Sequence, residues 1–155
     1  MKSANLIKSL TIIFLTLGGI AYAADRDSKG TGTAKATFAG GCFWSVELLF
    51  DKVDGVLSTI SGFTGGAKKN PTYEDVVTGA TGHAEAVQIT YDPKKISYEK
   101  LLEVFWRNID PLTPNGQFCD FGSQYRTAIF YQNETEKRLA ETAKKALQGR
   151  FKQPI

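Results

Sequence analysis

Residues 35–50 read KATFAGGCFWSVELLF, a short strand pattern that runs through two glycines into a helical pattern. Gly40 and Gly41 allow the backbone to turn sharply and to approach a ligand closely. Apolar residues then recur every three or four positions, which predicts a helix over residues 43–52. This strand–turn–helix unit places Cys42 at the N-terminus of a helix.

A cysteine at a helix N-terminus is a candidate nucleophile. The free backbone N–H groups and the helix dipole favour its thiolate over its thiol, and the thiolate is the reactive form. A lone cysteine can equally be a small buried hydrophobe. Phe43 and Trp44 also have two interpretations, as aromatic residues of the core or as an apolar wall beside the thiol.

The pattern of the rest of the chain predicts an α+β domain. The predicted order β-α-β-β-α-β-α indicates a ferredoxin-like split βαβ core (β-α-β-β-α-β) with an extra C-terminal helix. Two long loops, 68–81 with one helical turn around 73–76 and 110–123, are where a site is expected. Beyond residue 50, strands are predicted over 56–63, 84–91 and 125–131, and helices over 98–108 and 135–148.

Composition sets the class of protein. The chain has 155 residues, 42% of them hydrophobic and 23% charged, which suits one globular domain and excludes a disordered chain. Its two cysteines and one histidine are too few for a disulfide scaffold or a closed zinc site, so we expect no metal and no bound cofactor.

The N-terminal residues have the pattern of a secretory signal peptide. Lys2 and Lys8 precede an apolar run over 10–20 and an A-x-A site at Ala21-Tyr22-Ala23, which predicts a signal peptide over residues 1–23. An uncleaved membrane anchor is the alternative, but the run is about half of the ~20 residues that span a bilayer. We expect residues 24–34 to be a flexible linker.

The predicted cleavage also bears on partners and location. Removal of residues 1–23 leaves 17 basic residues, from 19 less Lys2 and Lys8, against 16 acidic ones. A net charge so close to zero gives no electrostatic case for a nucleic-acid partner. We expect an exported monomer with no stable membrane insertion, in the periplasm if the source is a Gram-negative bacterium.

Glu85 is the second candidate for chemistry. It shares a strand face with the apolar residues Val87, Ile89 and Tyr91, and burial there would raise the pKa of the carboxyl and make it an acid. An exposed glutamate at a strand end is the alternative. Of the other polar candidates, His83 would have to lie beside Cys42 to form a nucleophilic pair. Tyr73 and Tyr125 are either hydroxyl donors or packed aromatics.

Five motifs in order resemble one family. The chain from about residue 35 to its end is similar to the peptide methionine sulfoxide reductases of the A type. The motifs are Gly41-Cys42-Phe43-Trp44, Gly62-Phe63-Thr64-Gly65-Gly66, Asn70-Pro71-Thr72-Tyr73, Gly82-His83-Ala84-Glu85 and Gly122-Ser123-Gln124-Tyr125-Arg126.

The resemblance implies thiol-dependent reduction of protein-bound and free L-methionine (S)-S-oxide through a Cys42 sulfenic acid, a repair of oxidised exported proteins. It implies oxidised methionine-containing proteins or peptides as substrates and a thioredoxin-like protein or small dithiol as external reductant. The implied roles are Cys42 as nucleophile, Glu85 as acid, Tyr73 and Tyr125 as phenols that hold the sulfoxide oxygen, Phe43 and Trp44 as the wall for the S-methyl group, and Asp120 as a polar pocket residue.

Two departures from the family pattern matter. The family usually has glycine where this chain has Ser45. Family members also usually continue past residues 151–155, often with resolving cysteines, so we expect residues 35–155 to be a C-terminally truncated reductase domain. Cys119 is then the only internal candidate for a resolving cysteine.

Two other readings stay open at this level. One is a non-catalytic exported binding domain with a structural disulfide between Cys42 and Cys119. The other is a Cys–His hydrolase, which would require His83.

Overall fold

The computed structural model describes residues 32–155. The predicted signal peptide, residues 1–23, and most of the predicted linker lie outside the described residues. No helix within residues 32–155 is both long and apolar enough to cross a membrane.

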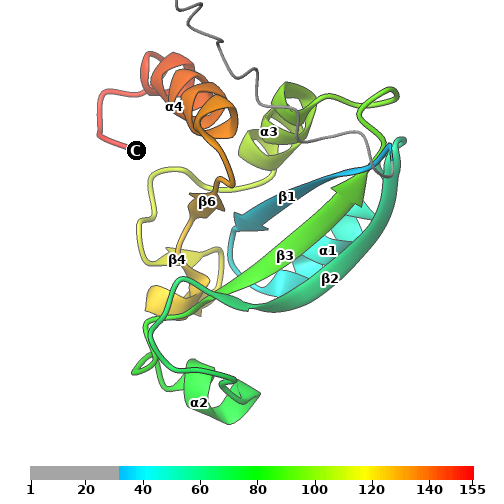
Figure 1. Ribbon diagram of the computed structural model, residues 1–155. Coiled ribbons are helices and arrows are strands. Elements are labelled where there is room, and N and C mark those ends of the chain that lie inside the picture. The colour runs from blue at the N-terminus through cyan, green and yellow to red at the C-terminus, as the bar shows by residue number, and fades with distance from the viewer. Residues whose placement is uncertain (1–31) are drawn as a thin grey trace, which may run out of the picture.

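A four-stranded sheet organises the domain, as Figure 1 shows. Its order is β2-β3-β1-β6, and each neighbouring pair is antiparallel. The predicted α+β class is confirmed. The strands span Ala34–Ala39 (β1), Val56–Thr64 (β2), Ala84–Tyr91 (β3) and Ala128–Phe130 (β6).

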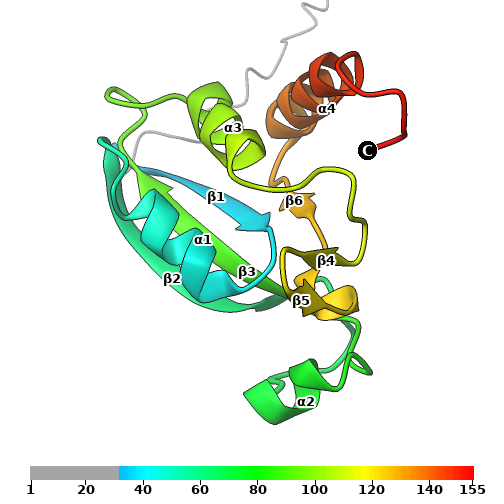
Figure 2. The same ribbon diagram turned by 180° about the vertical axis from the view of Figure 1, so that it is seen from behind.

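Two helices cover one face of this sheet, α1 over Phe43–Phe50 and α3 over Tyr98–Arg107, as the view from behind in Figure 2 shows. Ser97 caps α3 by accepting a hydrogen bond from the backbone N–H of Lys100. The side chains of α3 that face the sheet recur at helical spacing, which gives the buried stripe expected of an amphipathic helix. They are Tyr98, Leu101, Leu102 and Phe105.

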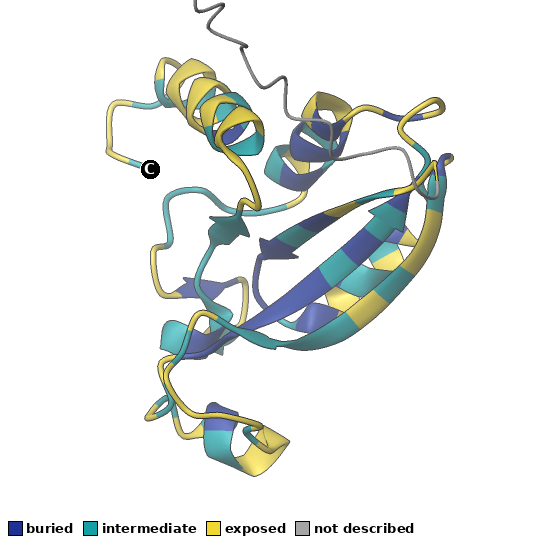
Figure 3. Cartoon of the chain, in the orientation of Figure 1, coloured by how far each residue is buried: buried dark blue, intermediate teal, exposed yellow. Residues whose placement is uncertain are grey.

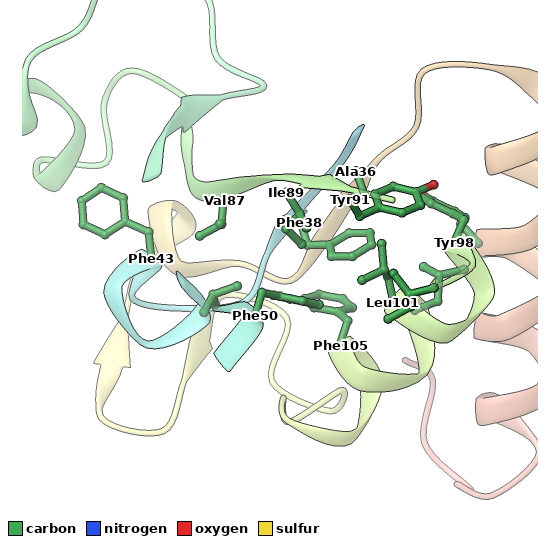
Figure 4. Close-up of a cluster of buried hydrophobic side chains, with 14 residues drawn as sticks. Ala36, Phe38, Phe43, Phe50, Val87, Ile89, Tyr91, Tyr98, Leu101 and Phe105 are labelled. Carbon is green, nitrogen blue, oxygen red and sulfur yellow. The ribbon is translucent and has the colours of Figure 1, made fainter. Parts of the chain in front are cut away.

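Aromatic rings fill the space between the sheet and these helices (Figure 4). The Phe38 ring of β1 lies 5.7 Å from Phe50 of α1, and 6.0 and 5.0 Å from Tyr98 and Phe105 of α3. Each such pair adds about 0.5–1.5 kcal/mol beyond the burial of its apolar area. The core therefore anchors α1, and with it Cys42, to the centre of the sheet.

The strand predicted over 125–131 is wrong in length. Only Ala128–Phe130 pairs as a strand, and Ser123–Tyr125 forms a 3-10 turn (η1). Arg126 explains why the strand begins late, because its guanidinium donates to the carbonyls of Ser123 and Gly82 and holds this stretch in the loop region. Local alternation cannot reveal the bond to Gly82, which lies 44 positions away.

The two predicted loops contain short elements. The helical turn expected around 73–76 is α2, Tyr73–Val77, which stands away from the sheet in Figure 1. Thr72 and Asp75 form a capping box that starts it. The second loop contains an unpredicted hairpin of β4 (Gly116–Gln117) and β5 (Asp120–Phe121).

The last helix, α4, spans Glu134–Gln148 and packs beside α3. Asn133 caps it by accepting a hydrogen bond from the backbone N–H of Glu136. Figure 3 shows burial concentrated in β3, whereas the outer face of α4 is exposed. The first four residues of β3 are all buried, so this end of the strand lies deep inside the molecule.

Candidate active site

Cys42 lies at the junction of β1 and α1. Gly41 has φ +89°, a conformation that glycine adopts without strain, and a Cβ there would lie 2.5 Å from Cβ of Gln117. Cys42 is the N-cap residue of α1, and its thiol makes no capping bond to the helix. Its carbonyl accepts the N–H groups of Ser45 and Val46 instead. The turn therefore leaves a half-buried thiol free for chemistry.

Glu85 lies directly against the start of α1. Only 1% of this residue is exposed, and its Oε2 accepts a 3.0 Å hydrogen bond from the backbone N–H of Phe43. Burial raises the pKa of the carboxyl, the Phe43 hydrogen bond opposes that rise, and the charge of Asp120 adds to it. Because burial is the largest of the three effects, Glu85 stays protonated to a higher pH than an ordinary glutamate.

The aromatic residues gather around Phe43. Its ring, 8% exposed, lies 5.6 Å from Trp44, 5.7 Å from Phe63 and 6.5 Å from Tyr73. Trp44 is 67% exposed, so it borders the solvent rather than the core. Phe63 lies opposite Glu85 in the pairing of β2 with β3, which brings this unpredicted ring to the site.

Tyr125 interacts electrostatically with the other candidate site residues. Burial raises the pKa of its phenol most, and the charges of four other groups raise it further. Those groups are Glu85, Tyr73, Asp120 and Cys42. The thiol, both phenols and both carboxyls are therefore close enough to interact electrostatically, although they come from five separate segments.

Gln117 is a positioning residue that the sequence did not reveal. Its side chain is 1% exposed, and its amide bonds to the N–H and carbonyl of Asp110 and to the hydroxyl of Thr127. The close approach of Gly41 to Gln117 then holds the β4–β5 hairpin beside Cys42. A polar residue in a loop carries no local sign of such a role.

The His83 side chain bonds to the backbone of the first long loop and makes no bond to the Cys42 thiol. Its Nδ1 accepts from the backbone N–H of Gly66, and its Nε2 lies 2.8 Å from the carbonyl oxygen of Lys68. The bond from Gly66 requires an unprotonated Nδ1, so Nε2 carries the hydrogen and donates it. Both ring nitrogens are thus occupied by backbone groups, and the geometry does not favour the Cys–His hydrolase reading.

Cys119 lies in the two-residue loop of the β4–β5 hairpin and is exposed. Both cysteines are free thiols, which does not support a structural disulfide. The role of Cys119 as a resolving cysteine stays a prediction. Among residues 32–155, no three His, Cys, Asp or Glu side chains cluster in a way that could hold a metal ion.

The chain matches a known family over its described length. The family model for peptide methionine sulfoxide reductase matches residues 34–155. A relative from Halalkalibacterium halodurans, described as peptide methionine sulfoxide reductase MsrA, is 55% identical over 123 residues, which are 78% of this chain and 70% of that protein. A Bacillus licheniformis protein of the same description is 57% identical over 122 residues, 77% of this chain and 67% of that protein.

Solved structures agree with the sequence matches. Mxr1 from Saccharomyces cerevisiae in its reduced form has a TM-score of 0.75 at 31% identity, over 79% of this chain and 72% of that one. Methionine sulfoxide reductase A of Corynebacterium diphtheriae has a TM-score of 0.70 at 32% identity, over 79% of this chain and 61% of that one. Mxr1 in complex with Trx2, at 24% identity and a TM-score of 0.58, shows the shared fold alone.

Proposed function

The chain belongs to the peptide methionine sulfoxide reductase family, and we propose that it reduces L-methionine (S)-S-oxide, in peptides and as the free amino acid, with Cys42 as nucleophile and Glu85 as acid. The observation that carries the assignment is the bond between the Phe43 N–H and the Glu85 carboxyl. It holds a buried acid of raised pKa one residue from the thiol.

The chemical step transfers oxygen from substrate to enzyme. The Cys42 thiolate attacks the sulfoxide sulfur while the sulfoxide oxygen takes a proton from Glu85, which a poor leaving oxygen needs. The attack forms a transient S–S bond, and the protonated oxygen then moves to the Cys42 sulfur. The substrate S–O bond and the S–S bond both break, and an S–O bond forms at Cys42. Methionine leaves reduced by two electrons, Cys42 is oxidised by two to a sulfenic acid, and Glu85 regains a proton from water.

The surrounding side chains orient the substrate. The phenols of Tyr73 and Tyr125 donate hydrogen bonds to the sulfoxide oxygen. Burial raises the pKa of Glu85 and of Tyr125 most, and the charge of Asp120 adds to both increases. Phe43, with Trp44 and Phe63 against it, supplies an apolar surface for the S-methyl group. Oxygen on one side and methyl on the other select one hand of the chiral sulfur.

A thiol then returns Cys42 to its reduced state. The incoming sulfur displaces the hydroxyl of the sulfenic acid, forming a disulfide and water, and a second thiol breaks that disulfide. The internal thiol is Cys119 and the external reductant is a thioredoxin-like dithiol protein. The yeast protein Mxr1 has been solved with Trx2, which supports this class of reductant.

The site of action is proposed from the N-terminal residues. Lys2, Lys8 and the A-x-A site at residues 21–23 support export with cleavage after Ala23. The mature protein would then repair oxidised exported proteins. Mass determination of the secreted chain tests this, and an N-terminus other than Ala24 contradicts it.

The reaction is tested by consumption of a dithiol that depends on each separated epimer of a methionine sulfoxide peptide. We expect turnover with the S epimer only. Cys42→Ser should abolish it, because a serine hydroxyl is not ionised near neutral pH. Turnover by the serine variant, or equal turnover of the two epimers, overturns the assignment.

A further inference from the structure

A cavity borders Cys42. It has a volume of about 140 Å³ and extends along the face of α1 that carries Ser45, Val46 and Leu49. These residues follow Cys42 by three, four and seven positions, so they share its side of the helix. Phe43 lies on a different face, and neither its ring nor Glu85, Tyr73 or Tyr125 lines this cavity. Of the residues assigned to the sulfoxide chemistry only Cys42 and Asp120 line the cavity, so most of its wall has no role in that chemistry.

One wall of the cavity is held under strain. Phe118 lines it and has φ +53°, a value that non-glycine residues rarely adopt. Gly116 pairs with Phe121 and Gln117 with Asp120, so Phe118 and Cys119 are the central residues of a two-residue turn. Positive φ at the first of them is typical of a type II′ turn, which favours glycine there.

The Phe118 side chain is also left in water. It is 76% exposed. Packing of the ring would remove the cost of its exposure, and a glycine at this position would remove both that cost and the backbone strain. Backbone strain of this kind concentrates where a side chain has a functional use. A partner that covers Phe118 would regain the apolar contact that the free protein lacks.

The chemistry of the cavity defines what would fill it. Five of its eleven lining residues are aliphatic or aromatic, and its polar part comes from Ser45, Asn108, Gln117 and Asp120. A cavity of about 150 Å³ is large enough for a benzene-sized group. Asp120 also lines the cavity, and its carboxylate would repel an incoming thiolate. The apolar walls are Val46, Leu49, Phe105, Ile109 and Phe118.

We propose that this cavity is a specificity subsite that binds an apolar side chain next to methionine sulfoxide in a peptide substrate, with Phe118 closing over that side chain. The proposal rests on the proposed function, because Cys42 must be the point at which the substrate is held. It predicts that oxidised methionine flanked by apolar residues, as in unfolded core segments, is the preferred substrate class.

The test compares two S-sulfoxide peptides, acetyl-Leu-Met(O)-Leu-amide and acetyl-Gly-Met(O)-Gly-amide, by their kcat/KM ratio. We expect the parent to prefer the leucine peptide by about tenfold, as an apolar pocket allows. Phe118→Gly suits the backbone at that position and should bring the ratio close to one. Phe121→Ala is the matched control, because Phe121 is 71% exposed in the same hairpin and does not line the cavity.

Ser45→Leu provides a second, independent variant. Ser45 is exposed at the cavity wall, so leucine there should occupy the space and also remove the preference. Equal use of both peptides by the parent, or a preference that survives both variants, overturns the subsite and leaves the proposed function standing. A change confined to the KM for the dithiol would identify a thiol site instead and also overturns it. Failure of the parent to reduce either peptide refutes the proposed function itself.

Discussion

The backbone N–H of Phe43 lies 3.0 Å from Oε2 of Glu85, a residue 42 positions further along the chain. The contact joins the first turn of α1 to the first residues of β3. It satisfies an N–H group that a helix N-terminus leaves free, and it fixes a carboxyl beside the thiol of Cys42. The same bond favours the ionised carboxylate, but burial favours the neutral acid more strongly, and the pKa of Glu85 is raised.

Replacement of Glu85 by glutamine should slow the chemical step. Glutamine keeps the shape and accepts the Phe43 hydrogen bond, but it has no acidic proton to transfer. Loss of a general acid costs about 10²–10⁴-fold in rate. The measurement is kcat at saturating S-sulfoxide peptide, with circular dichroism to confirm folding. A fall below tenfold would assign the proton to Tyr73, Tyr125 or water.

The raised pKa of Glu85 also predicts how stability depends on pH. A carboxyl whose folded pKa exceeds its unfolded value of about 4.3 contributes its full stability below that value, and loses it as the pH rises through the folded pKa. Glu85→Gln removes this loss. We expect urea unfolding to show the variant gaining stability relative to the parent between pH 4 and pH 8. A difference that stays constant across that range contradicts the buried acid.

Asp120→Asn should shift the pH profile of turnover. The charge of Asp120 raises the pKa of both Glu85 and Tyr125, so its removal lowers both values. The activity that requires protonated Glu85 should then disappear at a lower pH than in the parent. The measurement is kcat against pH on the alkaline side. Glu74→Gln, on the exposed surface of α2, is the control and should leave the profile in place.

Cys119→Ser tests how Cys42 is recycled. If Cys119 resolves the sulfenic acid, one equivalent of substrate should leave the parent with no free thiols. The serine variant should still release one methionine but keep a sulfenic acid that dimedone traps. Multiple turnover with a thioredoxin-like protein should fall, while small dithiols restore it. Free-thiol counting by mass spectrometry decides, and equal cycling of parent and variant with every reductant would make Cys119 a bystander.

Much of the scaffold follows from local pattern. The strand predicted over residues 84–91 is β3 at its observed bounds, because alternating and β-branched residues favour an extended chain wherever it lies. Ser97 marks the start of α3, since a cap acts within one turn. The glycines before Cys42 likewise predict the turn that leaves the thiol at a helix N-terminus.

Other features depend on contacts between distant segments, which no local period encodes. Gln117 packs on Gly41, 76 positions earlier in the chain. Arg126 bonds to Gly82, and the strand predicted over 125–131 is reduced to three residues. The site itself is of this kind. The reactive residue types and the resemblance to a family could be recognised in the sequence, because they are properties of short segments. That Glu85 is a buried acid bonded to Phe43 could be established only from the folded chain, because burial and its effect on a pKa arise from the atoms that folding brings around the carboxyl.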